Sequence, residues 1–233
     1  MTTPADDAKK AQIESELRAR YFPIIPQLPQ NWTAEQHDKN RLSRALAAFA
    51  IEKYADVAPA QGANAVVDGG NDNGIDALHF DRLNNRLWVV QSKAGAAADM
   101  GENKKFCDGI RDLVHSRFHK FNASFHRLQL DVEAALLADE LVIVGGQIHL
   151  SAGLGQHAID DLNQLKQELN QFHQRFDWQD LSLSRVHEWL TVEHAVEPLR
   201  VTVVLEKWYG VDQPRRAFYG LISAEQLAAI YNT

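Results

Sequence analysis

The chain has few of the features that mark secreted, membrane-spanning or disulfide-stabilised proteins. Cys107 is the one cysteine among 233 residues, which excludes an internal disulfide and a cysteine-rich zinc cage. No apolar run approaches the roughly 20 residues that span a bilayer, and the opening MTTPADDAKK lacks the apolar stretch of a signal peptide. The sequence therefore predicts a globular, cytoplasmic protein with no membrane partner.

An excess of positive charge is also lacking, since the formal net charge is −7. Nucleic-acid-binding proteins usually present a basic surface, so the total charge argues against such a partner. The distribution is uneven, however, because basic residues outnumber acidic ones between positions 104 and 127. Local fields matter more than totals. We therefore predict that this stretch contacts the phosphates of nucleic acid through Lys104, Lys105, Arg111, Arg117 and Lys120.

Alternating helix and strand patterns predict an α/β domain preceded by a helical arm. Residues 1–32 combine a polar helix with a proline-punctuated stretch and are expected to form the arm. Thr33 and Gln36 form a capping-box signature, which opens a helix running to about Asp56. Residues 33–233 are expected to form the main domain, a mixed β-sheet flanked by helices.

The rest of the chain predicts further elements and a continuation. Ser223 and Gln226 form a second capping box, but the helix that it opens reaches the last residue after barely two turns. Because so short a helix is marginal, we expect the chain to belong to a longer protein, with the missing C-terminal part as its partner. The other expected elements are helices at 105–128, 131–138, 159–172 and 184–190, a buried strand at 141–145, and a strand pair at 199–209 and 215–222.

Two strand patterns in the first half of the chain predict a β-hairpin. The segments 75–80 and 86–93 are rich in apolar residues, and Asn84-Asn85 between them suits a tight turn because asparagine tolerates positive φ. A loop rich in glycine, asparagine and aspartate precedes the first strand at 68–74. If the two asparagines are the centre of an even-length turn, paired residue numbers sum to 169.

That register places three polar side chains on one face of the hairpin. Asp76 would lie opposite Lys93, and Gln91 shares the face of Lys93 because side chains alternate along a strand. Opposed Cβ atoms lie about 4.5–5.5 Å apart and diagonal ones about 7–8 Å, close enough to share one metal ion and one phosphate. A loop of odd length would break this arrangement.

These residue types match the needs of phosphodiester hydrolysis, which are a divalent cation, an activated water and positive charge for the transition state. Asp76 offers a hard oxygen ligand for Mg²⁺, and the side-chain carbonyl of Gln91 offers a neutral one. Lys93 supplies a compact charge that can hold the attacking water or steady the developing oxyanion.

The pattern Gly-Ile-Asp76 followed by Val-Gln91-Ser-Lys93 resembles the Mrr-like form of the PD-(D/E)xK nuclease superfamily, in which glutamine replaces the second acidic residue. The longer segment 68–93, with the tail 219–231, resembles the N-terminal domain of abortive-infection phage-resistance (AIPR) proteins. This resemblance implies a restriction-endonuclease-like core, Mg²⁺ dependence with Mn²⁺ as a substitute, cleavage of DNA rather than RNA, and a role in phage defence.

The resemblance also implies an acidic residue from the preceding helix, and Glu52 is in the matching place. Because Gln91 removes one negative charge, metal binding would depend on Glu52 or Asp72, although Asp72 equally suits capping of the turn. Restriction-type enzymes often dimerise, but no apolar stripe specifies a homodimer interface here. Two alternatives stay open: a binding or regulatory module that lost turnover, and an interaction domain that serves the missing part of the protein.

Three weaker patterns are set aside. The 68–74 loop resembles a calcium loop, but His79 stands where a bidentate glutamate is required. His115 and His119 have a spacing that can chelate zinc, yet no acidic or cysteine partner is placed beside them. Residues 153–158 fit a loose dinucleotide-binding pattern, but the preceding strand ends too early.

Overall fold

The computed structural model describes residues 3–26, 33–195, 203–211 and 217–231. Contacts divide the chain into two compact units, Met1–Thr191 and Val192–Thr233. The first unit carries every predicted site residue. It also includes the residues of the predicted N-terminal arm.

A four-stranded mixed sheet is at the centre of the first unit, in the order β1-β2-β3-β4. β1 (Ala77–Asp81) runs antiparallel to β2 (Arg86–Lys93). β3 (Val142–His149) and β4 (Phe176–Leu181) continue the sheet in parallel with β2. The predicted class, a mixed sheet flanked by helices with a helical N-terminus, is confirmed, although β4 had no counterpart among the expected elements.

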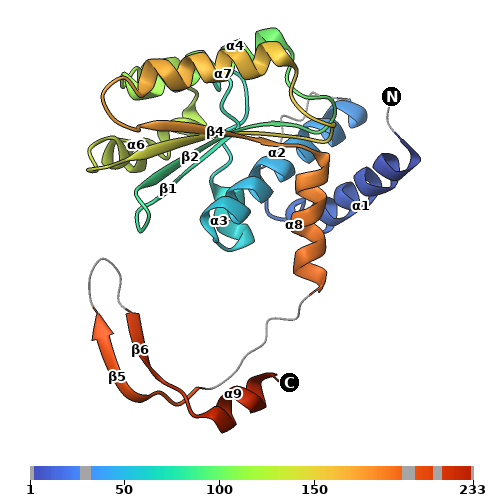
Figure 1. Ribbon diagram of the computed structural model, residues 1–233. Coiled ribbons are helices and arrows are strands. Elements are labelled where there is room, and N and C mark those ends of the chain that lie inside the picture. Colours follow the sequence, from blue (N-terminus) through green and yellow to red (C-terminus); the bar gives the residue numbers. More distant parts are fainter. Residues whose placement is uncertain (1–2, 27–32, 196–202, 212–216, 232–233) are drawn as a thin grey trace. The chain divides into compact units, whose positions relative to one another are not determined.

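One face of the sheet is covered by the helices from the two ends of this unit (Figure 1). They are α1 (Pro4–Tyr21), α2 (Ala34–Ala55), α3 (Pro59–Asn64) and α8 (Leu183–Ala195). The capping box of Thr33 and Gln36 begins α2, as predicted. Ile13 and Leu17 of α1 are fully buried against this core, so the polar arm expected from the sequence is part of the packed structure.

The other face is covered mainly by α4 (Met100–Val114) and α7 (Gln156–Leu169) (Figure 1). Three short elements, η1 (Phe118–Lys120), α5 (Ala123–His126) and α6 (Gln129–Leu136), complete this layer. The long helix expected at 105–128 is interrupted, because Ser116 takes a left-handed φ of 56°. Phe172 was predicted to be in the apolar stripe of the next helix, but α7 ends at Leu169 and Phe172 is 94% exposed.

The predicted hairpin forms, but its register differs from the expected one. Asp81 pairs with Arg86, and paired residue numbers sum to 167 rather than 169. The turn has this length because the Asp81 carboxylate accepts the backbone N–H groups of Leu83 and Asn84. A shift of two residues leaves every side chain on its predicted face, since the period of a strand is two.

The second unit contains an antiparallel strand pair and a helix. β5 (Glu206–Val211) pairs with β6 (Ala217–Leu221), and α9 (Ala224–Tyr231) follows. The predicted strand pair forms, but its first strand begins at Glu206 rather than near 199, and residues 199–202 lie outside the described part of the chain. The Ser223 cap is confirmed, because the N–H of Gln226 donates to Ser223 Oγ at 3.2 Å. The turn expected at 211–214 lies mostly outside the described residues. Among the residues that are described, no helix combines the length and the apolarity needed to cross a membrane.

Candidate functional site

The loop before β1 is pressed against α4 by two glycines. Gly74 has a φ of 79°, and a Cβ added there would lie 2.7 Å from the backbone nitrogen of Phe106. A Cβ on Gly109 would lie 2.1 Å from the carbonyl oxygen of Asn73. Only glycine fits at such distances, so these positions allow the helix to lie directly on the acidic loop.

Three aspartates of this loop and the strand that follows converge. Asp68, Asp72 and Asp76 each offer a carboxylate oxygen, and these oxygens all lie within 4.8 Å of one another. Two of the three are paired with cations: Arg44 Nε donates to Asp68 at 2.8 Å, and Lys105 Nζ donates to Asp72 at 2.7 Å. Three carboxyl groups therefore lie together with two cations, each of which pairs with one of them.

Asp76 is the member of this group with no cation in contact within the described part of the chain. Its Oδ2 accepts the backbone N–H of Ser92 at 2.6 Å and lies 3.2 Å from Ser92 Oγ. Burial raises the pKa of the Asp76 carboxyl well above its usual range, and the Asp68 and Asp72 charges raise it further against the opposing effects of Ser92 and Lys93. Without a metal ion these surroundings therefore favour the protonated form of Asp76, and a bound cation would favour the charged form.

Gln91 carries an orphaned oxygen. Its side chain is 3% exposed, and Nε2 donates to the carbonyl oxygens of Gly74 at 3.2 Å and Glu102 at 3.1 Å. Because both partners are acceptors, the amide cannot be turned over, so the oxygen's position is fixed. Oε1 is buried and has no hydrogen-bond partner among the described residues. Such an atom is costly unless a further group binds to it.

The corrected register places Asp76 beside Gln91 rather than opposite Lys93. The backbone N–H of Asp76 donates at 2.8 Å to the carbonyl of Val90, the residue that pairs with Ala77, so Asp76 lies just outside the paired residues of the hairpin. The charge of Lys93 acts on the Asp76 carboxyl. Gln91 and Lys93 lie on one face of β2, as the alternation of strand side chains had predicted, whereas the Asp76 carboxylate binds Ser92, whose hydroxyl faces Ser43 of α2.

Lys93 has a partner that the sequence patterns did not identify. Its Nζ lies 2.5 Å from Glu102 Oε1, and the lysine side chain is 32% exposed. Glu102 belongs to a capping box with Asp99 at the start of α4. That signature, directly after the strand carrying Lys93, was the available signal for a carboxylate at this place.

Glu52 does not join the acidic group. Arg20 Nη2 donates to its Oε1 at 2.5 Å, Lys53 Nζ lies 3.1 Å from the same oxygen, and the Tyr21 hydroxyl donates to Oε2. Burial and this bond to Glu52 raise the pKa of Tyr21. Glu52 therefore joins α1 to α2, and Asp68, which sequence reasoning did not select, lies where a third carboxylate was expected.

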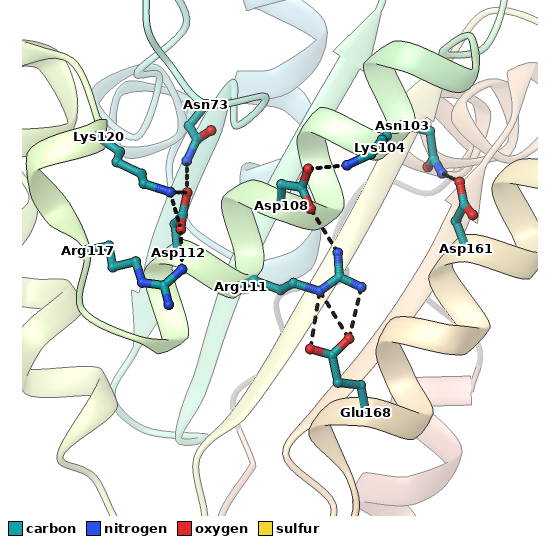
Figure 2. Close-up of polar contacts among 10 residues, drawn as sticks. All are labelled: Asn73, Asn103, Lys104, Asp108, Arg111, Asp112, Arg117, Lys120, Asp161 and Glu168. Carbon is teal, nitrogen blue, oxygen red and sulfur yellow. Dashed lines mark hydrogen bonds and ion pairs between the residues drawn. The ribbon is translucent and has the colours of Figure 1, made fainter.

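All five basic residues predicted to contact phosphate are engaged with carboxylates. Figure 2 shows Lys104 with Asp108, and Arg111 between Asp108 and Glu168. The same figure shows Asp112 accepting from Asn73, Arg117 and Lys120. Lys105 is the partner of Asp72 described above. A phosphate would have to displace a carboxylate at each of these positions.

A second buried polar residue lies next to Gln91 in the sheet. Gln147 of β3 is its partner in the parallel register and is 2% exposed. Its Nε2 donates to Asn103 Oδ1 at 2.7 Å, and Asn103 Nδ2 in turn donates to Asp161 at 3.1 Å, a contact that Figure 2 includes. No side-chain atom of Gln147 or Asn103 is buried without a hydrogen-bond partner, in contrast to Oε1 of Gln91.

A cleft of about 570 Å³ opens at the carboxyl end of β2. One wall comes from the first half of α2 and the other from the segment between β2 and α4. The lining residues are Gln36, Lys39, Asn40, Ser43, Lys93, Ala94, Gly95, Ala96, Ala97, Asp99 and Glu102. A smaller hollow of about 280 Å³ lies between β1 and α6, and none of the predicted site residues lines it.

Comparisons with known protein families, with curated proteins and with solved structures found no match for this chain. The resemblance to PD-(D/E)xK nucleases and AIPR proteins is therefore a hypothesis carried by the motif residues. What the site can do has to be argued from its own geometry and charge.

Proposed function

We propose that this protein is a metal-dependent nuclease that hydrolyses phosphodiester bonds, with DNA rather than RNA as its substrate. The observation that carries the proposal is the buried, unpartnered Oε1 of Gln91, next in register to a carboxyl whose pKa is raised by burial and by two other carboxylates. A divalent cation would relieve both features, because it binds hard oxygen atoms and offsets excess negative charge.

The residues fit a magnesium or manganese site. Asp76 and Gln91 Oε1 would hold the ion, and Asp72 or Asp68 would add a carboxylate oxygen from the same group. All of these are oxygen ligands, as Mg²⁺ requires, and Cys107, the chain's one thiol, is not among them. When bound, the ion would polarise the phosphate and lower the pKa of a bound water.

Lys93 would supply the positive charge that the transition state needs. Its ammonium lies at the edge of the cleft and is held by Glu102 at 2.5 Å. A carboxylate partner fixes the direction of the lysine side chain before substrate binds. Because the pair is partly exposed, an incoming phosphate can compete for the same ammonium.

Cleavage of phage or host nucleic acid in abortive infection is the biological role that we propose, and it rests on the resemblance of segment 68–93 to AIPR proteins. A second candidate, a nucleic-acid-binding module without turnover, is favoured by one observation. Arg44 and Lys105 already pair with Asp68 and Asp72, so two of the three carboxylates are neutralised without a metal.

The decisive experiment is cleavage of supercoiled plasmid and of single-stranded circular DNA with Mg²⁺ or Mn²⁺, repeated in chelator. Lys93→Ala is expected to lower the cutting rate by about 10²–10³-fold, the usual cost of removing a group that stabilises developing charge. Lys9→Ala, on the distant helix α1, is the matched control and should cut like the wild type. DNA binding that is retained without cutting, and that is indifferent to metal, would favour the second candidate.

A further inference from the structure

We propose that the cleft between α2 and the segment 94–99 binds the sugar–phosphate backbone of a single strand of nucleic acid, with Lys39 contacting a phosphate. This inference deepens the nuclease proposal and rests on it. It assigns substrate binding to a part of the chain that sequence patterns did not indicate, and away from the basic residues of α4.

The position of the cleft suits a binding site. β2, β3 and β4 are parallel, and ligands of open α/β sheets bind outside the carboxyl ends of such strands. The cleft lies at the carboxyl end of β2, where Lys93 is the last residue of the strand. Substrate held there would reach the proposed catalytic charge directly.

Lys39 is the cationic lining residue whose charge no described carboxylate offsets. Its side chain is exposed, and it has no ion pair among the residues that the structure describes. The two acidic lining residues are already engaged: Asp99 Oδ1 accepts the N–H of Glu102 at 2.8 Å, and Glu102 binds both the Asp99 N–H and Lys93. The unbalanced charge that faces the cleft is therefore positive and comes from α2.

The outer wall of the cleft is held by a hydrogen-bonded relay. The N–H of Ala97 donates to Ser151 Oγ at 3.0 Å, and Ser151 Oγ is hydrogen-bonded to His149 Nδ1 at 2.8 Å. His149 Nε2 then donates to Asp180 Oδ1 at 2.8 Å. His149 is 1% exposed. The relay ties the wall to the ends of β3 and β4, which gives a pre-formed rather than a collapsible cleft.

The inner wall joins the cleft to the carboxylate group. Ser43 Oγ of α2 donates to the Ser92 carbonyl at 2.9 Å, and Ser92 Oγ donates to the Ser43 carbonyl at 2.9 Å. The N–H of Ser92 binds Asp76 Oδ2. A single residue thus separates the cleft lining from Asp76, so a backbone lying along α2 would place a phosphodiester close to the proposed metal ligands.

The size and the lining of the cleft favour a single strand. A volume of about 570 Å³ lies within the roughly 300–1,000 Å³ of pockets that enclose one small ligand, which is room for a nucleotide or two and not for a duplex. No aromatic side chain is among the described lining residues, so bases would not stack there. Contacts to phosphate and sugar carry no sequence information, and cleavage would be sequence-tolerant.

The test is fluorescence anisotropy of the whole chain with a short labelled DNA strand, an RNA strand of the same sequence and the corresponding DNA duplex, all in chelator to prevent cutting. Lys39→Ala is expected to weaken single-strand binding about three- to tenfold. It should also reduce the slope of log Kd against log salt by about 0.7, the value for one phosphate contact on a single strand. Lys9→Ala and Lys104→Ala should change neither quantity.

The proposal would be overturned if Lys39→Ala changed the affinity for the single strand by no more than Lys9→Ala does. It would also be overturned if the duplex bound more tightly than the single strand. Tighter binding of the RNA strand with the same dependence on Lys39 would support the cleft and identify RNA as the substrate. The outcome is separable from that of the cleavage assay. Binding that depends on Lys39, without metal-dependent cutting, would support the cleft as a binding site and contradict the nuclease proposal. Metal-dependent cutting that does not change in Lys39→Ala would support the nuclease and contradict the role of the cleft.

Discussion

The basic stretch of α4 and the site at the end of β2 contain the same kinds of charged side chain, but they differ in whether their polar groups have partners. In α4 and the turn after it, each predicted phosphate contact pairs with a carboxylate, and Figure 2 shows these pairs for all of them except Lys105. At the end of β2, Lys39 has no ion pair among the described residues, Gln91 has an orphaned oxygen, and the pKa of Asp76 is raised. In the first region each of these cations has a carboxylate partner, whereas the second region contains groups with no partner among the described residues.

The difference teaches that the number of charges in a segment does not measure its capacity to bind. A cation that already has a carboxylate at 2.7–3.2 Å has its charge partly offset, so a phosphate gains less from meeting it. The buried Oε1 of Gln91 has already lost contact with water without gaining a hydrogen bond, and a ligand would recover that cost. The predictions below test whether the two regions differ in this way.

The largest expected effect comes from neutralising one aspartate in each region. Asp76→Asn should reduce metal-dependent cutting at least about 100-fold, yet raise the free energy of unfolding in chelator, because it removes a buried carboxylate close to two others. Asp112→Asn should leave cutting unchanged and lower the free energy of unfolding by roughly 1–2 kcal/mol, since Lys120 and Arg117 lose their partner. Plasmid cleavage and denaturant unfolding measure both quantities. Equal destabilisation by the two variants would contradict the comparison.

Gln91→Glu, the change toward the usual superfamily residue, should be destabilising. A carboxylate at this position would face the carbonyl oxygens of Gly74 and Glu102, which now receive the amide hydrogens. We expect a loss of about 1–3 kcal/mol in the free energy of unfolding in chelator. Gln61→Glu is the matched control, because Gln61 uses its oxygen to accept the Ala58 N–H and a carboxylate preserves that bond. A Gln91→Glu variant as stable as this control would show that the two donated hydrogen bonds contribute nothing.

Asp76 and Asp112 should also make the free energy of unfolding depend on pH in opposite directions. Burial first, and then the Asp68 charge, raise the pKa of Asp76, so the folded state keeps a proton that the unfolded chain releases near pH 4, about the ordinary value. Stability in chelator therefore falls as pH rises above about 4. Burial acts to raise the pKa of Asp112 as well, but the hydrogen bonds from Lys120, Asn73 and Arg117 together outweigh it and lower this pKa. The contribution of Asp112 is therefore lost as pH falls below about 4.

Unfolding free energies across this pH range, measured in chelator, check the signs. Asp76→Asn should remove part of the decline on the alkaline side, and Asp112→Asn part of the decline on the acid side. If the wild-type curve keeps its shape in either variant, the corresponding aspartate does not titrate as its surroundings imply.

Local patterns predicted the face of the strand residues but not which residues converge. Gln91 and Lys93 were placed on one face correctly even though the register was wrong by two, because alternation along a strand survives an even shift. Glu52 and Asp68 show the limit. Both are acidic residues close to the hairpin, and the packing of α1 on α2 assigns Glu52 to Arg20 and Tyr21.

The strand β4 shows the same limit at the level of the fold. Its sequence, FDWQDL, has polar residues at 177, 179 and 180, which breaks the alternation typical of a strand, and it lies directly after a helical pattern. It becomes a strand because it pairs with β3, from Ile143 with Phe176 to Ile148 with Leu181. That pairing joins segments about thirty residues apart, which no local period encodes.

The smallest expected effect compares adjacent lysines of α4. Lys105 Nζ lies 2.7 Å from Asp72, within the carboxylate group, whereas Lys104 Nζ lies 2.7 Å from Asp108, outside it. Lys105→Ala would leave Asp72 without a competing cation, so calorimetric titration with Mn²⁺ should show metal binding up to about fivefold tighter, the limit for a partly exposed pair. Lys104→Ala should leave the affinity unchanged, because its side chain is 71% exposed and contacts no member of the group. Weaker binding in Lys105→Ala would mean that the lysine organises the carboxylates rather than competing with the metal.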